Sequence, residues 1–292
     1  MWQQITYAHE HTTIDLSGVK KDADCRLDEF AQTLAEFKNL KKLGVARIID
    51  VTARGMGRNL AYVQKMSEAS GLKILVSTGY YKEPFLPPEV YELSEQELAQ
   101  IMIRELTAGI EGSGLKASLI GEIGTSQGQM EPLERKVFRA AARAHLETGA
   151  PLSTHTTLGT LGLEQLQLFK EMGVDLTKVY IGHVDLSHDV DYILRLLDTG
   201  ANVGFDTVGK LKYAPDTERI RELLAIEQHG LTGQVLLSMD ITRKSHLKIN
   251  GGPGYAYLLE NFVPAALKAG VSREACEQML VKNAQRLYKE EA

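Results

Sequence analysis

A recurring pair of segments most constrains how this 292-residue chain can fold: a short apolar run, followed by a longer amphipathic stretch. Eight of the apolar runs are short and bounded by polar or turn-forming residues, as buried strands are. They cover residues 6–9, 46–52, 73–79, 115–122, 151–155, 178–183, 201–206 and 235–240.

Amphipathic patterns of helical period separate these runs. They cover residues 27–43, 59–70, 94–109, 133–148, 160–172, 189–198 and 216–228, and two more, 255–268 and 273–288, follow the last run. Gly44 and Gly149 directly follow two of these patterns, where glycine ends a helix without steric strain. Strands alternating with helices of this length predict a parallel sheet. Eight such units predict an α/β fold, a (β/α)8 TIM barrel, as one domain over residues 1–292.

An open, doubly wound sheet is the main alternative fold. Such sheets often open their first helix with a GxGxxG phosphate-binding turn, and no such motif stands near the N-terminus here. No linker rich in proline, glycine or serine divides the chain either. The closed single-domain barrel is therefore the prediction.

Charge and composition exclude several classes of partner. The formal net charge is −5, whereas a nucleic-acid-binding surface needs a basic face. No apolar run approaches the ~20 residues of a membrane helix, and the N-terminus lacks the pattern of a signal peptide. Cys25 and Cys276 form no CxxC pair and fit two reduced thiols. We expect a cytoplasmic protein that binds neither nucleic acid nor membranes.

Polar side chains stand at the carboxyl ends of five predicted strands. His9 and His11 lie two residues apart on the first strand, so they share one face of it. Each of the others ends an apolar run; they are Glu122, His155, His183 and Asp240. In barrels of this type the active site lies at the carboxyl ends of the strands.

Four imidazoles and two carboxylates are a ligand set that suits zinc, with manganese and cobalt as alternatives. Six ligands exceed the needs of one four-coordinate ion, but two divalent ions ~3.5–4 Å apart would use them all. Each histidine taken singly could equally be a satisfied interior residue. Four of the chain's eight histidines standing at strand ends favours the metal centre. We interpret His145, His188 and His229 as structural or solvated.

This five-strand pattern resembles the amidohydrolase superfamily. The segments AHEH, GEIGTS, STHT, IGHVD and SMDITRKSHLKINGGPGY resemble its phosphotriesterase family over essentially the whole chain. The resemblance implies a metal-dependent hydrolase that attacks ester bonds with a metal-bridging hydroxide. By the same resemblance, His9, His11 and Asp240 bind the more buried metal, and His155 and His183 bind the more exposed one. Asp240 is then also catalytic, because it accepts the hydroxide's proton and passes it to the leaving group.

One departure from the family pattern concerns the residue between the metals. The phosphotriesterases proper use a carboxylated lysine there, whereas this chain has Glu122, which supplies the same single negative charge. Lys116 lies on the same predicted strand, but at the strand's rise per residue it is ~20 Å away, so we reject it as the bridge. The departure disfavours hydrolysis of organophosphate triesters.

Basic residues in the loops after the seventh and eighth strands suggest an anionic substrate. They are Lys210, Lys212, Arg243, Lys244 and Lys248, with glycines at 251, 252 and 254 opening the next helix. These loops often form a phosphate site in such barrels. Arg243 and Lys244, just past Asp240, are the candidate phosphate ligands. Tyr80 after the third strand is a further candidate for substrate binding. Tyr81, which follows it, and Asp206 at the end of the seventh strand could equally line the pocket, and Arg54 and Arg58 could add positive charge.

The leading hypothesis is a lactonase whose small-molecule substrate is a phosphorylated sugar lactone, with its carbonyl at the metals and its phosphate at the basic loops. The first alternative is a phosphotriesterase or phosphodiesterase that uses the same two metals. The second is a metal-bearing binding protein with vestigial activity. Members of the family are often dimers, so the resemblance also implies a homodimer.

Overall fold

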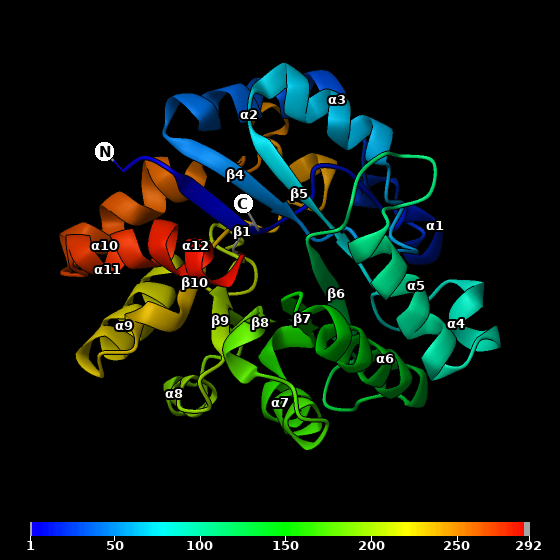
Figure 1. Cartoon of the computed structure of the whole chain (residues 1–292). Helices are drawn as coiled ribbons and strands as arrows, with labels where there is room; N and C mark the ends of the chain where they lie inside the picture. Colours follow the sequence, from blue (N-terminus) through cyan, green and yellow to red (C-terminus); the bar gives the residue numbers. More distant parts are fainter. Residues whose placement is uncertain (1, 289–292) are drawn as a thin grey trace.

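A ring of eight parallel strands forms the centre of the computed structural model, which describes residues 2–288 (Figure 1). The ladder runs in the order β1 (Ile5–Glu10), β4 (Val45–Asp50), β5 (Lys73–Thr78), β6 (Leu119–Thr125), β7 (Leu152–Thr156), β8 (Val179–Gly182), β9 (Asn202–Phe205) and β10 (Val235–Leu237). The predicted α/β barrel is confirmed, because consecutive strands of the ring pair in parallel, each next to its neighbour in the chain.

Helices surround the ring (Figure 1). The seven predicted inter-strand patterns each contain one helix, namely α2 (Phe30–Lys42), α3 (Leu60–Ser70), α5 (Glu95–Thr107), α6 (Pro132–Thr148), α7 (Gly162–Glu171), α8 (Val190–Leu197) and α9 (Asp216–Gln228). After β10 come a π-helical segment, Leu258–Phe262, then α10 (Val263–Ala269), α11 (Arg273–Glu277), a second π-helical segment, Gln278–Lys282, and α12 (Asn283–Leu287). Short elements in the loops complete the fold: β2 (Ile14–Asp15), α1 (Ser17–Lys20), β3 (Arg26–Leu27) and α4 (Pro88–Glu92).

Helix boundaries follow local chemistry. Ser94 and Glu97 form a reciprocal capping box at the start of α5, which satisfies backbone N–H groups that have no partner within the helix. Gly44 follows α2 with a φ of +96°, and a Cβ there would lie 2.4 Å from the carbonyl oxygen of Trp2. Only glycine therefore allows the chain to turn from α2 into β4 at this point.

The fourth barrel strand begins later than the sequence predicted. Residues 115–118 belong to a loop, because the backbone N–H of Ile110 donates to the carbonyl of Leu115, closing a turn before the strand. The strand starts at Leu119 and continues beyond Glu122 to Thr125. Lys116 is exposed in this loop, which agrees with rejecting it as the residue between the metals.

Alternation along the strands divides the core in two. Ile48 faces the helices with most of the buried apolar residues, whereas Ile49 faces the barrel interior with Leu75 and Leu236. Leu287 of α12 packs in the same interior cluster. The amino end of the barrel is thus filled with apolar side chains, which leaves the carboxyl end for the polar ones.

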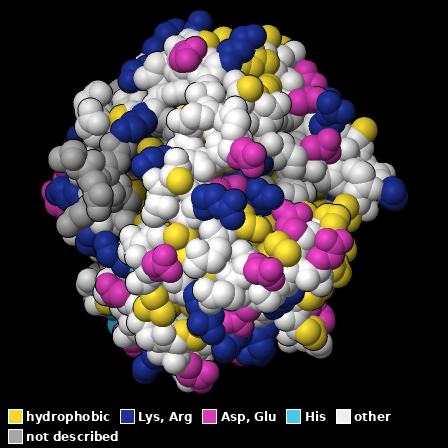
Figure 2. Space-filling view, turned by 45° about the vertical axis from the view of Figure 1, so that its right-hand side comes forward, with side chains coloured by type: hydrophobic (Ala, Val, Ile, Leu, Met, Phe, Trp, Pro, Cys, Tyr) yellow, Lys and Arg dark blue, Asp and Glu magenta, His cyan; other side chains and the backbone are white. Residues whose placement is uncertain are grey.

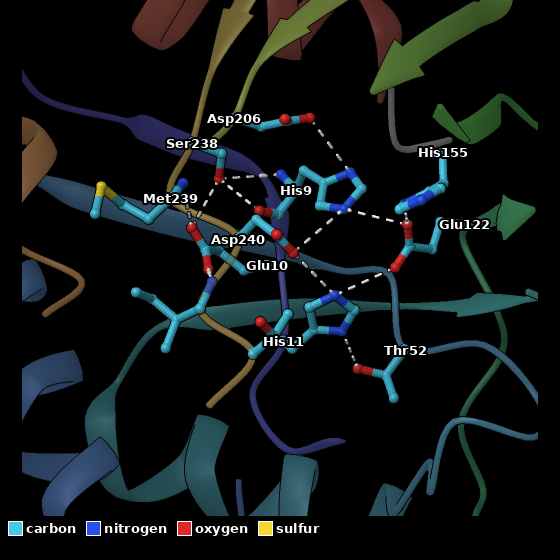
Figure 3. Close-up of polar contacts among 12 residues, drawn as sticks. His9, Glu10, His11, Thr52, Glu122, His155, Asp206, Ser238, Met239 and Asp240 are labelled. Atoms are coloured by element: carbon cyan, nitrogen blue, oxygen red, sulfur yellow. Dashed lines mark hydrogen bonds and ion pairs between the residues drawn. The ribbon is translucent and has the colours of Figure 1, made fainter. Parts of the chain in front are cut away.

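A side chain joins the first and last strands. Within residues 2–288 the ladder includes no direct pairing of β1 with β10. Instead, the Glu10 carboxylate accepts the backbone N–H groups of Met239 at 2.7 Å and Ile241 at 3.1 Å (Figure 3). The hydroxyl of Ser238 donates to the backbone carbonyl of His9 at 2.7 Å and accepts from the backbone N–H of His9 at 3.2 Å. We call this contact between Glu10 and residues 238–241 the seam.

The surface agrees with the modest net charge. On the face shown in Figure 2, acidic and basic side chains are interspersed and apolar side chains occur in small groups. Cys25 and Cys276 are both buried, and neither forms a disulfide. No helix within residues 2–288 combines the length and apolar character needed to cross a membrane.

Candidate metal centre

The six predicted ligands meet at the carboxyl ends of the strands. His9 and Glu122 lie within β1 and β6, and His11 directly follows β1. The other three stand within or just after their strands: His155, His183 and Asp240. Four of them are nearly inaccessible to solvent, whereas the side chains of Asp240 and His155 are 11% and 14% exposed. We call these six side chains the cluster; Figure 3 labels all of them except His183.

Glu122 occupies the centre of the cluster. Its Oε1 lies 3.3 Å from Nε2 of His11, and its Oε2 lies 3.6 Å from Nε2 of His9. The same Oε2 is 3.1 Å from Nδ1 of His155 and 3.8 Å from Nε2 of His183. One carboxylate thus reaches both histidine pairs, which is what a bridging ligand requires.

Asp240 faces the first-strand histidines with one oxygen and a lysine with the other. Oδ1 lies 3.3 Å from Nε2 of His11 and 3.8 Å from Nε2 of His9, while Oδ2 forms an ion pair with Lys210. Burial disfavours the charged form, but Lys210 and the histidines outweigh burial and hold the pKa of Asp240 well below its usual value. Asp240 is therefore an ionised base in the neutral range.

Hydrogen bonds at the outer nitrogens fix how two histidines point. Nδ1 of His11 lies 2.8 Å from Oγ1 of Thr52, whose hydroxyl donates onward to the Thr13 carbonyl, so the imidazole donates to Thr52. Nδ1 of His183 lies 2.7 Å from Oδ1 of Asp206. In both rings the remaining Nε2 points into the cluster, as is usual for histidines that bind metals.

The inner nitrogens supply the test of whether metals fit. Nε2 of His9 and of His11 are buried and have no hydrogen-bond partner among the described residues. Buried polar atoms without a partner are rare and costly, and a cation among them would satisfy both lone pairs. Three groups of three ligand atoms, each within 4.8 Å of one another, overlap here: His9–His183–Asp240, His9–His11–Glu122 and Glu122–His155–His183. The residues fit more than one ion.

A cavity of about 270 Å³ opens above the cluster. Its apolar wall includes Ile14, Leu16, Met56, Phe85 and Leu186, and its cationic side chains are Lys20, Lys82, Lys210 and Arg243. Tyr81 also lines it, with the phenol oxygen 3.3 Å from both ring nitrogens of His155. Burial raises the pKa of Tyr81 well above its usual value, so the phenol remains protonated and can donate a hydrogen bond.

Of Arg243, Lys244 and Tyr80, the structure brings only Arg243 to the cavity, which two other candidates, Lys210 and Tyr81, also line. Lys244 points away and pairs with Asp28 and Glu29, at 3.3 Å and 2.9 Å. Arg243 has extended backbone angles, and successive side chains of an extended segment point to opposite sides. Arg243 and Lys244 therefore cannot both face the cavity, and only Arg243 does.

Tyr80 shows the same alternation. Tyr80 is fully buried outside the cavity lining, and the guanidinium carbon of Arg54 lies 5.9 Å from the centre of its ring. The next residue, Tyr81, faces the cavity instead. Arg54 and Arg58 bind Glu105 on this outer side.

The remaining weaker candidates lie elsewhere. Lys212 is exposed outside the cavity lining, and Lys248 pairs with Glu260 at 2.9 Å. Asp206 lies beneath the cluster, where it contacts His183, and it does not line the cavity. The histidines interpreted as structural have partners outside the cluster: a backbone carbonyl for His145 and His229, and Glu218 for His188.

Three basic residues of the cavity escaped the sequence analysis. Lys82 directly follows Tyr80 and Tyr81 at the end of a predicted strand, and this position could have marked it as a candidate. Lys20 stands in a loop excursion after β1 that has no periodic pattern, so nothing in the sequence marked it. His246 lines the cavity from the loop after β10 and had been left without a role.

Comparison with known proteins agrees with this geometry. A model of the phosphotriesterase family matches residues 3–288. The phosphotriesterase homology protein of Escherichia coli (strain K12) is 49% identical over 283 residues, which cover 97% of each chain. The crystal structure of the E. coli protein, complexed with phosphate in its active site, has a TM-score of 0.97 at 48% identity, covering 98% of this chain and 99% of that one.

A lactonase from Listeria monocytogenes is also similar, with a TM-score of 0.93 at 30% identity over 99% of this chain and 95% of that one. Three findings now agree: the eight paired strands, the cluster of imidazoles and carboxylates, and a family match over nearly the whole chain. The chain belongs to the phosphotriesterase family and is a metal-dependent hydrolase that acts on ester bonds.

Proposed function

We propose that this protein is a lactonase with two divalent metals, and that its substrate carries an anionic group, as a phosphorylated sugar lactone does. The observation that carries the proposal is that one cavity contains both the metal-binding cluster at its base and four cationic side chains in its wall. A lactone has a carbonyl for the first and, when phosphorylated, an anion for the second.

The ligand assignment follows from burial and reach. His9, His11 and Asp240 would hold the more buried metal, since His9 does not line the cavity. His155 and His183, which do line it, would hold the more exposed one, and Glu122 lies between the two pairs. Zinc suits this set, with manganese and cobalt as alternatives. When bound, the two ions supply a nucleophile at neutral pH and polarise the carbonyl of the ester.

Asp240 moves the proton. Its carboxylate is ionised before the reaction, so it can take up the proton that the nucleophile releases and deliver it to the leaving oxygen. Lys210, in ion-pair contact with one carboxylate oxygen, keeps the side chain turned toward the cavity. Tyr81 keeps its phenol proton beside His155 and is placed to donate a hydrogen bond to the substrate.

Two similar proteins support this reading of the substrate. The solved E. coli relative is complexed with phosphate in its active site, and the Listeria relative is a lactonase. Glu122 in place of a carboxylated lysine continues to disfavour phosphotriesters. A homodimer and a cytoplasmic location stay predictions from the sequence.

A substrate panel tests the proposal. Zinc-loaded protein is assayed against plain lactones, sugar lactones, their phosphorylated forms, and aryl phosphotriesters and phosphodiesters. We expect lactone opening, with the phosphorylated sugar lactones having the highest kcat/KM. Faster turnover of the phosphate esters would replace the proposal with the phosphotriesterase reading. Tight binding of a lactone without any turnover would favour a binding protein.

A further inference from the structure

The four cationic side chains of the cavity differ in what they already bind. Lys210 forms an ion pair with Asp240, and Arg243 pairs with Asp22 at 2.8 Å and with Asp24 at 3.5 Å. Their charge is largely neutralised within the chain. Lys20 and Lys82 also line the cavity, but neither forms an ion pair with any carboxylate of residues 2–288. The positive charge still available to a ligand therefore lies with these two lysines.

Lys82 is held in place along its whole length. A Cβ on Gly124 of β6 would lie 3.2 Å from Cβ and 3.3 Å from Cδ of Lys82, so the lysine stem runs directly over this glycine. The same Cβ would lie 3.2 Å from Cβ of His155. The N–H of Gly124 also donates to the carbonyl of Tyr81 at 2.9 Å. Glycine at this position lets Lys82 pack closely beside the cluster.

Among residues 2–288, the ammonium group of Lys82 has one direct polar contact, a hydrogen bond of 3.0 Å to the backbone carbonyl of Glu83. It lies 5.8 Å from the ring centre of Tyr81 and 5.9 Å from that of Phe85. The ammonium of Lys20 lies 5.8 Å from the same Phe85 ring. Aromatic faces attract cations, so Phe85 gathers two positive charges at one side of the cavity.

The energetics favour an anion between these groups. Burial has the largest effect on Lys82 and lowers its pKa; among the surrounding charges Glu134 raises the pKa, Lys20 lowers it, and Glu122 and Glu83 raise it, with none of these carboxylates in ion-pair contact with the lysine. Two like charges without a carboxylate in contact repel each other, and a bound oxyanion relieves that repulsion. The oxyanion would also take the place of water at the two ammonium groups, and their hydrogen bonds to an anion are stronger because both partners are charged.

We propose that Lys82 and Lys20 form the anion subsite of the cavity. The carboxylate, phosphate or sulfonate group of the substrate then lies beside Phe85, on the His155 side of the cluster, and not at Arg243. The inference rests on the proposed function, because it locates the anionic group of that function's substrate. Lys82 is the main specificity determinant, since its stem is fixed, and Lys20 adds charge from the more exposed α1.

Lys82→Met and Lys20→Met test the subsite, with Lys21→Met as the matched control. Lys21 is the exposed neighbour of Lys20 outside the cavity lining, and its replacement removes the same charge. With a phosphorylated lactone, Lys82→Met is expected to raise KM about tenfold or more and to leave kcat little changed. With the unphosphorylated lactone, KM should stay within about twofold. Lys82→Arg should restore part of the discrimination, and Lys21→Met should match the wild type.

A binding measurement keeps the test independent of turnover. The affinities of zinc-loaded protein for ribitol, which is uncharged, and for its phosphate ester, ribitol 5-phosphate, are compared by calorimetry. Lys82→Met should weaken binding of the ester alone. Equal losses for both compounds, or a larger loss for the ester in Arg243→Met than in Lys82→Met, would overturn the subsite. Failure of the wild type to open any lactone, with the binding difference intact, would instead overturn the proposed function.

Discussion

In the proposed mechanism, the single side chain of Asp240 combines a structural and a chemical task. Its backbone is left-handed, with a φ of 49°, and the seam holds the residues on both sides of it. One oxygen faces His11 and the other faces Lys210. Such constrained conformations are costly and occur where the position of a side chain matters.

Asp240→Asn is predicted to abolish most of the activity. The amide keeps the size of the carboxylate but cannot take up a proton, so kcat should fall about 100-fold or more. Rates are measured alongside metal content by elemental analysis, with zinc added in excess, to separate lost proton transfer from lost metal. A variant that holds two metals and turns over within about threefold of the wild type would show that Asp240 does not move the proton.

Glu222 is predicted to make stability depend on pH. Its carboxylate is buried without a hydrogen-bond partner among the described residues, and burial, with Asp185, raises its pKa to about 7. A group with a raised folded-state pKa contributes stability below its unfolded pKa and loses that contribution as pH rises through about 7. Glu222→Gln should therefore stabilise the protein on the order of 2 kcal/mol at pH 8, and little at pH 5.

Urea unfolding at the two pH values, followed by circular dichroism, measures this difference. The variant Glu68→Gln, at an exposed position of α3 that forms no ion pair among the described residues, is the control and should behave alike at both. An equal effect of Glu222→Gln at pH 5 and pH 8 would mean that Glu222 does not titrate between them.

At the scale of elements, the seam replaces a missing strand pairing. Glu10→Ala would leave the buried N–H groups of Met239 and Ile241 without acceptors, at about 1–3 kcal/mol each. Glu10→Gln should cost less, because its amide oxygen can still accept one of these bonds. Denaturant unfolding of the two variants gives the comparison. If alanine proved no worse than glutamine, the seam would not depend on the acceptor.

The strand ends were predictable because an apolar run ending in a polar residue is a local signal, and alternation on a strand is strict. It placed His9 and His11 on one face correctly. The same alternation continues into the loops. There it turns Arg243 and Tyr81 toward the cavity and their neighbours Lys244 and Tyr80 away from it. The early start predicted for β6 failed for another reason, since Leu115 is apolar but closes a turn through its backbone.

At the scale of the whole molecule, the fold follows from repetition, and the cluster follows from closing the ring. Once eight strands close, their carboxyl ends must meet, so residues far apart in sequence such as His9 and Asp240 come together. The ion pairs that neutralise Arg243 and Lys244 join loops distant in sequence, and no local pattern predicts them. For this reason the cluster could be predicted from the sequence and the proposed anion subsite could not.

The central claim is that these six residues hold two metals in a hydrolase. Metal content per chain is the most direct measurement, made by elemental analysis on protein purified without chelator and then loaded with zinc or manganese, with ester hydrolysis assayed in parallel. The account predicts two equivalents, falling to one or fewer in Glu122→Ala, and activity that chelation removes and metal restores. Well under two equivalents in the loaded wild type, with no gain in activity from either metal, would contradict it.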